Sequence, residues 1–208
     1  MRARIMVFSR TPEPGEVKTR LVPALGAEGA ARLHERLTHR AVRTAVASGV
    51  GSVELWCTPT TVHPFFSELA SAFPLRLRLQ RGVDLGERMA AAFDDALSEA
   101  STALLIGSDS PDLGQEDLRA AMTALQGGCD VVLGPAADGG YVLIGLRRPA
   151  PELFRNMAWG TAEVLALTRE RLGQSGRRWN ELPVRHDLDR PEDLRRFPDL
   201  RNSVSESL

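Results

Sequence analysis

The stretch that most constrains the fold is Leu104–Leu113, which reads Leu-Leu-Ile-Gly-Ser-Asp-Ser-Pro-Asp-Leu. It begins with an uninterrupted apolar run, which is typical of a strand buried on both faces of a parallel sheet. The run stops at Gly107, and two carboxylates, Asp109 and Asp112, follow closely. Ligands of open α/β sheets bind beyond the carboxyl ends of the strands. The stretch therefore predicts an α/β fold with a candidate binding site at Asp109.

Both aspartates have a structural as well as a functional interpretation. Asp109 could begin a turn at the Ser-Pro dipeptide, and Asp112 could cap the next helix. We interpret Asp112 as the helix cap. For Asp109 we favour a function, the binding of a divalent metal against a phosphate, because other segments of the chain converge on the same sheet edge.

Apolar periodicity divides the rest of the chain into alternating strands and helices. The expected strands are Ile5–Phe8, Ser52–Cys57, Leu75–Leu79, the strand that begins at Leu104, Asp130–Leu133, Tyr141–Leu146 and Glu181–Val184. Helices between them are expected to end at Gly49, Phe73, Leu97, Gly127 and Leu172, the last capped by Thr161, and a short one to open at Pro191. The alternation predicts a three-layer α/β/α, Rossmann-like fold with a mixed, mostly parallel sheet.

Composition limits the class of protein. The chain has 208 residues, 43% of them hydrophobic, a formal net charge of −1 and two cysteines, Cys57 and Cys129. The near-zero charge provides no basic field for a nucleic acid, and the distant cysteines are expected to be buried free thiols. No apolar run approaches the length of a membrane span, and the chain starts without an apolar leader. We expect one cytoplasmic domain over residues 1–201 and a flexible polar tail over 202–208.

The loop after the first strand combines turn residues with cations. Pro12–Gly15 breaks the strand, and Lys18 and Arg20 follow before a long helix. Loop amides, a helix N-terminus and two cations together can bind a polyphosphate. The loop is not a Walker A motif and contains no GxGxxG. A solvated basic loop is the structural alternative, and the expected position of Asp109 at the same sheet edge favours phosphate binding.

Two later segments combine glycine with side chains suited to the wall of a pocket. Asp138, Gly139, Gly140 and Tyr141 lie where two strands are joined, and Trp159 precedes another glycine. Asp-Gly is a common hairpin sequence, but two glycines also let a ligand approach the backbone closely. The tryptophan is either part of the core or part of a pocket. We take Gly139, Gly140, Tyr141 and Trp159 as candidates for substrate binding, and Asp138 as a candidate base or acceptor contact.

A third group of carboxylates lies near the C-terminus. Asp187 and Asp189 flank Leu188 and therefore point to the same side of an extended segment. One of them could complete a metal site with Asp109, because Mg²⁺ and Mn²⁺ prefer carboxylates together with phosphate oxygens. Capping of the helix at Pro191 is the alternative. The four histidines do not cluster, and none is assigned to a metal.

These segments together resemble the DUF2064 family. They are Ser9-Arg10-Thr11-Pro12 with Lys18-Thr19-Arg20-Leu21, then Gly107–Leu113, then Gly134-Pro135 with Asp138–Tyr141, and Trp159-Gly160-Thr161. The resemblance runs from about Ile5 to Leu194, in the same order. It implies the GT-A fold of nucleotide-diphospho-sugar transferases, a bound nucleotide and a metal. The family is often labelled as glycosyltransferases.

Two of the segments are also similar to nucleotidyltransferases. The loop that ends in Lys18–Pro23 is similar to that of 2-phospho-lactate guanylyltransferases. The run Asp187–Leu194 is close to the Asp-x-Asp-Thr-Pro-Glu-Asp-Leu ending of several nucleotidyltransferases, but it has Arg190 where they usually have Thr. Glycosyl and nucleotidyl transferases share this scaffold, so the resemblance does not decide which group is transferred.

We therefore expect a Mg²⁺- or Mn²⁺-dependent transferase with a nucleotide or nucleotide-sugar donor and a small-molecule acceptor, and we favour glycosyl transfer. The alternatives are a nucleotidyltransferase that releases pyrophosphate from a triphosphate, and a non-catalytic nucleotide-binding protein. Contacts to the nucleotide are expected from Ser9, Arg10, Lys18, Arg20 and Ser108. The expected metal ligands are Asp109 and one of Asp187 and Asp189, and the candidates for catalytic roles are Asp109 and Asp138.

Overall fold

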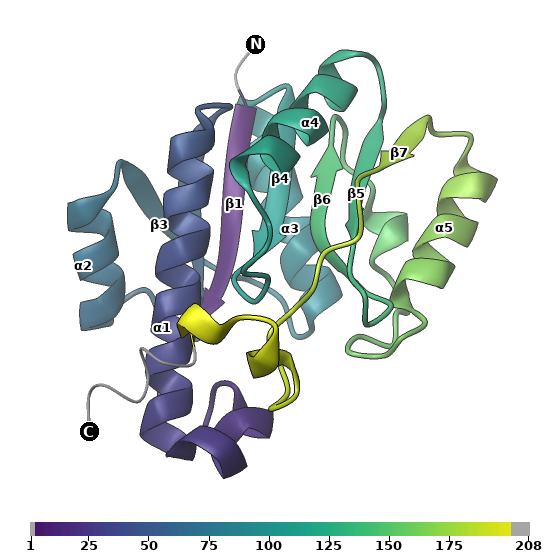
Figure 1. The fold of residues 1–208 in the computed structure, drawn as a ribbon. Helices are drawn as coiled ribbons and strands as arrows, with labels where there is room; N and C mark the ends of the chain where they lie inside the picture. Colours follow the sequence, from purple (N-terminus) through teal and green to yellow (C-terminus); the bar gives the residue numbers. More distant parts are fainter. Residues whose placement is uncertain (1–2, 201–208) are drawn as a thin grey trace.

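The computed structural model describes residues 3–200, and the tail predicted at 202–208 lies outside the described residues. A seven-stranded sheet forms the centre of this part of the chain, in the order β3-β2-β1-β4-β6-β5-β7 (Figure 1). The strands are β1 (Ala3–Arg10), β2 (Ser52–Thr58), β3 (Leu75–Leu79), β4 (Thr102–Gly107), β5 (Val131–Pro135), β6 (Tyr141–Leu146) and β7 (Trp179–Glu181). Strand β6 runs antiparallel to β4 and β5, and the other neighbours are parallel. The predicted mixed, mostly parallel sheet is confirmed.

Helices cover both faces of the sheet. The α-helices are α1 (Val22–Ser48), α2 (Pro64–Ala72), α3 (Leu85–Glu99), α4 (Gln115–Gln126) and α5 (Val164–Ser175), and the short 3₁₀ helices are η1 (Thr19–Leu21), η2 (Pro151–Leu153) and η3 (Asp193–Arg195). One apolar cluster packs α1, α2 and α4 against the sheet, and a second packs α3 and α5 against the other face. The fold is therefore the expected three-layer α/β/α arrangement.

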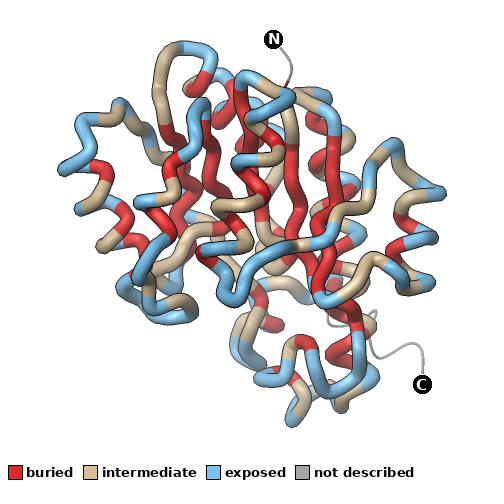
Figure 2. The backbone as a smooth tube through the Cα atoms, turned by 180° about the vertical axis from the view of Figure 1, so that it is seen from behind, coloured by how far each residue is buried: buried red, intermediate tan, exposed pale blue. Residues whose placement is uncertain are grey.

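The central strands are buried on both faces, as their apolar runs predict. In β1, Ile5 and Val7 belong to the first apolar cluster, and Met6 and Phe8 to the second. Side chains alternate between faces along a strand, so an unbroken apolar run is the pattern that two covered faces require. Figure 2 shows these strands as the most buried part of the molecule.

The pairing of β1, β4 and β6 determines which residues meet at one edge of the sheet. Strands β1 and β4 are parallel neighbours, with Phe8 opposite Gly107. Strand β6 runs the other way, with Ile106 opposite Leu143, so its first residue, Tyr141, lies at the same edge. The residues that follow β1 and β4 and those that precede β6 therefore surround one space.

The C-terminal segment folds back under this edge and packs against the start of the chain. A third apolar cluster joins three leucines of this segment to three of η1 and α1, namely Leu188, Leu194 and Leu200 to Leu21, Leu33 and Leu37. Figure 1 shows the C-terminal segment beside the loop that precedes α1, below the strand ends. The packing delivers the carboxylates around Leu188 to the sheet edge.

Two predicted helix caps are wrong. Helix α4 begins after Gly114, not after Asp112, and the amide of Gly114 donates to Asp117 Oδ2 at 2.8 Å. Helix α5 begins after Glu163, and the Thr161 hydroxyl instead donates to the carbonyl of Ala158 at 2.8 Å. In both cases a longer loop separates the candidate cap from the helix, a length that residue type alone does not indicate.

The last predicted elements also differ from the observed ones. Strand β7 is Trp179–Glu181 rather than the predicted Glu181–Val184. Pro183, which has no amide hydrogen to donate to a neighbouring strand, lies outside the observed strand. The short helix expected at Pro191 is the 3₁₀ helix that begins at Asp193. The carboxylate of Asp193 accepts hydrogen bonds from the amides of the two residues before Pro191, at 3.1 and 2.8 Å.

Both cysteines are free, and Cys57 is buried while Cys129 is half-buried. Burial raises the pKa of the Cys57 thiol to about 12, so at neutral pH it is a core group and not a nucleophile. Within residues 3–200, no helix combines the length and the apolar character that crossing a membrane requires.

Candidate functional site

A large cavity opens at the carboxyl edge of the sheet, between the ends of β1 and β4, the loop before α1 and the C-terminal segment. Its volume is about 630 Å³, which is within the usual range of ligand sites. The side chains predicted to bind nucleotide and metal all line it: Ser9, Arg10, Lys18, Arg20, Ser108, Asp109, Asp187 and Asp189. The fold thus brings together residues that are far apart in the sequence.

A small cavity of about 230 Å³ adjoins the large one. Asp138, Gly140, Tyr141 and Trp159, which were predicted near the substrate, line this small cavity. The rings of Tyr141 and Trp159 pack edge to face, with their centroids 6.3 Å apart. Tyr141 and Asp187 line both cavities and so mark the boundary between them.

Gly139 is the predicted substrate-binding residue that lines neither of these cavities. Its φ is +91°, and a Cβ placed there would lie 2.3 Å from the carbonyl oxygen of Ala162. Its own carbonyl accepts a hydrogen bond from the amide of Leu165 at 2.8 Å. Gly139 therefore fastens the turn before β6 to the start of α5, and only glycine fits this close approach.

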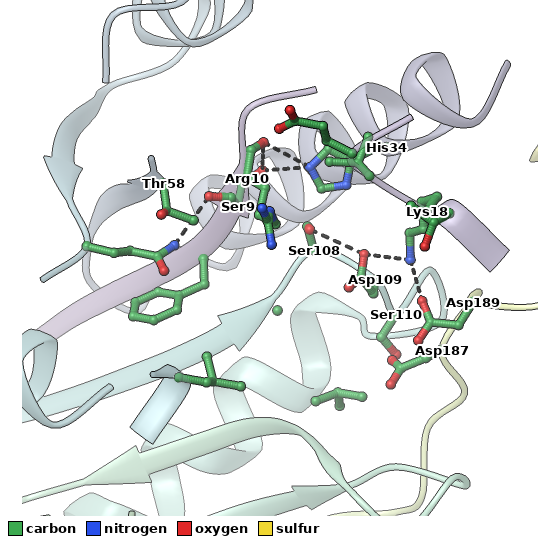
Figure 3. A pocket seen from close by; sticks show the side chains of 18 of the residues that line it. Ser9, Arg10, Lys18, His34, Thr58, Ser108, Asp109, Ser110, Asp187 and Asp189 are labelled. Carbon is green, nitrogen blue, oxygen red and sulfur yellow. Dashed lines mark hydrogen bonds and ion pairs between the residues drawn. The ribbon is translucent and has the colours of Figure 1, made fainter. Parts of the chain in front are cut away.

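An ammonium group joins two carboxylates in the wall of the large cavity (Figure 3). Lys18 Nζ lies 2.7 Å from Asp109 Oδ1 and 2.7 Å from Asp189 Oδ1, and it donates to the carbonyl of Leu188 at 2.7 Å. All three of its hydrogens are therefore used. The Lys18 side chain is only 4% exposed, whereas those of Asp109 and Asp189 are 45% and 38% exposed and face the cavity. In this arrangement Lys18 holds the acidic residues in place.

The charges in this cluster stabilise one another. Burial opposes the charge of Lys18, but the attraction of Asp109 and Asp189 outweighs it and raises the pKa of the ammonium group. Partial desolvation opposes the charge of Asp109, but the attraction of Lys18, together with that of His34 when the imidazole is protonated, outweighs it and lowers the pKa of that carboxyl. Both groups are therefore charged at neutral pH.

Asp187 forms no ion pair with another side chain of residues 3–200. Its pKa is raised to about 7, first because it is buried and then because Asp109, Asp189 and Asp138 repel its negative charge. Lys18 only partly offsets this repulsion. The cluster therefore holds more negative charge than its own cation neutralises, which is the electrostatic condition that favours a bound divalent cation.

The acidic residues fit a magnesium- or manganese-type site that a phosphate completes. Asp109, Asp187 and Asp189 supply the hard oxygen atoms that these ions prefer. Among residues 3–200, no three His, Cys, Asp or Glu side chains form a ready metal cage. Mg²⁺ is usually held by one or two carboxylates plus substrate phosphates and water, not by an all-protein cage. The fit is thus to a metal that binds together with a phosphorylated ligand.

The C-terminal segment is pinned to the loop after β4 by polar contacts. Ser110 donates to the carbonyl of His186 at 3.0 Å, and the amide of Leu188 donates to the carbonyl of Asp109 at 2.8 Å. Asp112, the predicted cap, accepts hydrogen bonds from the amide of His186 at 3.1 Å. These contacts set the positions of the carboxylates on either side of Leu188, and neither of those carboxylates caps the last helix.

His34 is a site residue that the sequence analysis did not identify. It projects from α1 into the large cavity, and its Nε2 lies 3.2 Å from Ser9 Oγ and 3.0 Å from the carbonyl oxygen of Arg10. Ser9 also contacts Thr38 Oγ1 at 3.0 Å. Figure 3 shows His34 on the side of the cavity beside Ser9 and Arg10. The sequence signal was a histidine and a threonine four residues apart on the inward face of a helix.

Acidification should destabilise the protein through His34. Burial lowers its pKa, the attraction of Asp109 and the hydrogen bond with the Arg10 carbonyl only partly oppose this, and the charges of Lys18 and Arg10 lower the pKa further. The unfolded chain, with a histidine pKa near 6.5, therefore binds the proton more readily, so stability falls as the pH falls through about 6.5. The slope has an upper limit of about 1.4 kcal/mol per pH unit.

The measurement is urea denaturation of wild type and His34→Gln from about pH 8 to about pH 5.5. We expect wild type to lose more unfolding free energy than His34→Gln over this range. His39→Gln, at an exposed position of the same helix, should behave like wild type. Equal pH slopes for wild type and His34→Gln would show that His34 does not carry this effect.

The opposite end of the large cavity presents polar groups at the ends of β1 and β2. The Gln80 side-chain amide donates to the carbonyls of Trp56 at 2.8 Å and Ser9 at 3.3 Å, which leaves its oxygen as an acceptor. Arg88 of α3 and Thr58 also line this end. Gln80 was not predicted as a site residue, although it directly follows β3 at the carboxyl edge of the sheet, where ligands of such sheets bind.

Comparison with solved structures finds the same fold in proteins that are named as transferases. A protein from Desulfovibrio desulfuricans G20, named "putative nucleotide-diphospho-sugar transferase", has a TM-score of 0.83 and 29% identity over 98% of this chain and 99% of that chain. The inositol-1-phosphate CTP transferase from T. maritima has a TM-score of 0.60 and 13% identity over 100% and 98% of the two chains.

A third similar structure is a complex with metal and nucleotide. It is the glucosyl-3-phosphoglycerate synthase from Mycobacterium tuberculosis with Mn²⁺, UDP and glucosyl-3-phosphoglycerate. Its TM-score is 0.55, with 12% identity over 98% of this chain and 77% of that chain. At these low identities, the second and third likenesses show the shared fold only.

A comparison with curated proteins found no match. A comparison with protein-family models did find one. The family profile described as "Uncharacterized protein conserved in bacteria (DUF2064)" matches residues 41–161, which is more than half of the chain. The matched part includes Asp109, the turn at Asp138 and Trp159, all of which line the two cavities. The chain therefore belongs to the DUF2064 family.

Proposed function

We propose that this protein is a divalent-metal-dependent glycosyltransferase that uses a nucleotide sugar as donor. The observation that carries the proposal is the large cavity itself. It joins an acidic cluster, Asp109, Asp187 and Asp189, to a polar end at Gln80 that is suited to a nucleobase. A nucleoside diphosphate has the matching parts, a base at one end and a metal-binding diphosphate at the other.

The residues around the diphosphate have distinct roles in this proposal. The exposed Arg10 and Arg20 contact phosphate oxygens, for which charge-assisted hydrogen bonds are suited. Ser9 and Ser108 lie at the ends of β1 and β4 and contact the nucleotide from the sheet edge. Lys18 orients the acidic residues and adds positive charge to their side of the cavity.

Asp109, with Asp187 or Asp189, would hold Mg²⁺ or Mn²⁺ in this site. When bound, such an ion stabilises the negative charge that develops on the departing diphosphate. The protein's own side chains hold the donor in place, and they exclude water from the small cavity. The fit rests on the carboxylate oxygens of Asp109, Asp187 and Asp189, which line one cavity.

The transfer step needs a base on the side of the acceptor. The acceptor hydroxyl oxygen forms a bond to the anomeric carbon of the donor sugar, and the bond from that carbon to the diphosphate oxygen breaks. The electron pair leaves with the nucleoside diphosphate, and the hydroxyl proton passes to a carboxylate. Asp138 lines the small cavity and is our candidate for this role, and Gly140, Tyr141 and Trp159, which line the same cavity, are our candidates for the wall around the acceptor.

The names of similar proteins support this proposal in part. The relative at 29% identity is named for nucleotide-diphospho-sugar transfer. Nucleotidyl transfer is the second candidate, because the C-terminal segment with Asp187 and Asp189 resembles a nucleotidyltransferase ending and a CTP transferase shares the fold. Two cations and an acidic cluster serve a diphosphate and a triphosphate equally well, so the acidic end of the site does not discriminate.

Product analysis decides between these activities. The protein is incubated with Mn²⁺ and either nucleotide sugars or nucleoside triphosphates. We expect slow, Mn²⁺-stimulated release of nucleoside diphosphate from a nucleotide sugar, with water as a poor substitute for the acceptor. Pyrophosphate release from a triphosphate, with no response to any nucleotide sugar, would replace this proposal by nucleotidyl transfer. Nucleotide binding without either product would indicate a non-catalytic nucleotide-binding protein.

A further inference from the structure

The small cavity is lined mainly by apolar and acidic side chains, although it adjoins the cluster that we propose binds phosphate. Most of its lining is apolar or aromatic, with Met89, Leu105 and Val164 among the contributors. Its charged side chains are two carboxylates, Asp138 and Asp187. Within the described residues 3–200, none of the residues that line it is lysine, arginine or histidine. Among residues 3–200, the protein therefore contributes no cationic side chain of its own to the lining of this cavity for an anionic ligand.

Two cations near this cavity are hydrogen-bonded to other groups. The ammonium group of Lys18 donates its three hydrogens to Asp109, Asp189 and the backbone carbonyl of Leu188. Arg171, which lies toward the buried Tyr141 hydroxyl, donates to three backbone carbonyls, those of residues 152, 153 and 156. A phosphate in the small cavity would meet carboxylates and apolar carbon, an environment that disfavours a desolvated anion.

The carboxylates also leave acceptor atoms for a hydroxyl group. Asp138 Oδ1 accepts the amide hydrogen of Gly140 at 2.9 Å, and no donor in the described part of the chain reaches Asp138 Oδ2. An alcohol can donate to such an oxygen while its carbon skeleton contacts the apolar wall. The volume of about 230 Å³ limits the ligand to a small molecule.

We propose that the small cavity selects an uncharged, hydroxyl-bearing acceptor with an apolar face, and that it rejects phosphorylated and carboxylated acceptors. This inference rests on the proposed function, since it names the acceptor class of that site. It separates this chain from enzymes of the same fold whose acceptor is itself a phosphate, because such an acceptor needs a cation that this wall lacks.

The test compares two probes of one skeleton, benzyl alcohol and benzyl phosphate. Binding is followed by the fluorescence of Trp159, taken as the difference between wild type and Trp159→Phe, in the presence of Mn²⁺ and saturating nucleoside diphosphate. We expect saturable binding of benzyl alcohol and at least tenfold weaker binding of benzyl phosphate. Benzyl phosphate that binds as tightly as the alcohol, or an alcohol that does not saturate, would overturn the proposal.

A charge variant makes the test independent of the absolute affinities. Thr161 is exposed and lines only the small cavity, so Thr161→Arg adds a cation there. We expect this variant to improve benzyl phosphate binding at least tenfold relative to benzyl alcohol. Val62→Arg, at a position 85% exposed and outside both cavities, adds the same charge and should leave the preference unchanged. An unchanged preference in Thr161→Arg would contradict the proposed cause.

Failure of this inference is distinguishable from failure of the proposed function. Binding of the nucleoside diphosphate at the large cavity is measured first and alone, by its Mn²⁺-dependent thermal shift. A protein that binds no nucleotide but still prefers the alcohol contradicts the proposed function and not the charge preference. A protein that turns over a nucleotide sugar but prefers the phosphorylated probe contradicts only the inference about the acceptor.

Discussion

Asp109→Asn should reduce metal-dependent turnover of the donor at least about 100-fold while the protein stays folded. The asparagine amide would keep the shape of the side chain but lose the charge that, with Asp187 or Asp189, holds the metal in our proposal. The substitution also removes one partner of Lys18, whose ammonium group retains Asp189 and a backbone carbonyl. Because Asp109 is about half exposed, we expect this loss to cost only about 1 kcal/mol of unfolding free energy.

The measurement combines donor turnover with nucleotide affinity, each with and without Mn²⁺. Asp94→Asn is the matched control, because Asp94 is an exposed aspartate of α3 that lines neither cavity. It should behave like wild type in both assays. Equal Mn²⁺-dependent nucleotide affinity in wild type and Asp109→Asn would remove Asp109 from the metal site.

Lys18→Met should lower the free energy of unfolding by about 2 kcal/mol and loosen the C-terminal segment. Methionine fills a similar volume but donates nothing, so Asp109, Asp189 and the carbonyl of Leu188 lose a shared partner. Breaking a fully buried ion pair costs about 3–5 kcal/mol, and we expect less here because both carboxylates are partly exposed to solvent. Turnover should fall as well, since Asp189 is no longer held at the sheet edge.

Urea denaturation gives the change in stability, and hydrogen exchange of residues 186–200 reports on the segment itself. Arg20→Met is the control for stability, because Arg20 lies in the same loop but is exposed. It should change the unfolding free energy by less than about 0.5 kcal/mol. Unchanged protection of residues 186–200 in Lys18→Met would show that the ammonium group does not anchor the segment.

Much of the fold could be predicted from the sequence, because its signals are local. The apolar run at Leu104 and the run at Ile5 predict strands buried on both faces, and these are the central pair β4 and β1. Turn residues and helical periodicity located the helices in order. The errors, such as the caps assigned to Asp112 and Thr161, arose where the length of a loop decides which residue meets the helix end.

The residues expected to bind nucleotide and metal line one cavity, but their contacts could not be predicted from the sequence. Residues after the ends of parallel strands lie at one sheet edge, and this rule placed Asp109 and Lys18 in the same cavity. The rule does not say that Lys18 pairs with Asp189, because that pairing depends on how the C-terminal segment folds back. The same limit applies to His34 and Gln80, which reach the site by long-range packing.

The central claim, that the large cavity binds a nucleoside diphosphate together with a divalent metal, is tested most directly by thermal shift. The melting temperature is measured with UDP, GDP, CDP and ADP, each with Mn²⁺, without it, and after chelation. At about 100 times its dissociation constant, a ligand stabilises the folded state by about 2.7 kcal/mol, which for a chain of this size raises the melting temperature by about 5–10 °C. We predict a shift of this size for at least one nucleoside diphosphate with Mn²⁺, and its loss on chelation and in Asp109→Asn. No shift with any of the four, or a shift that survives both chelation and Asp109→Asn, would contradict the account.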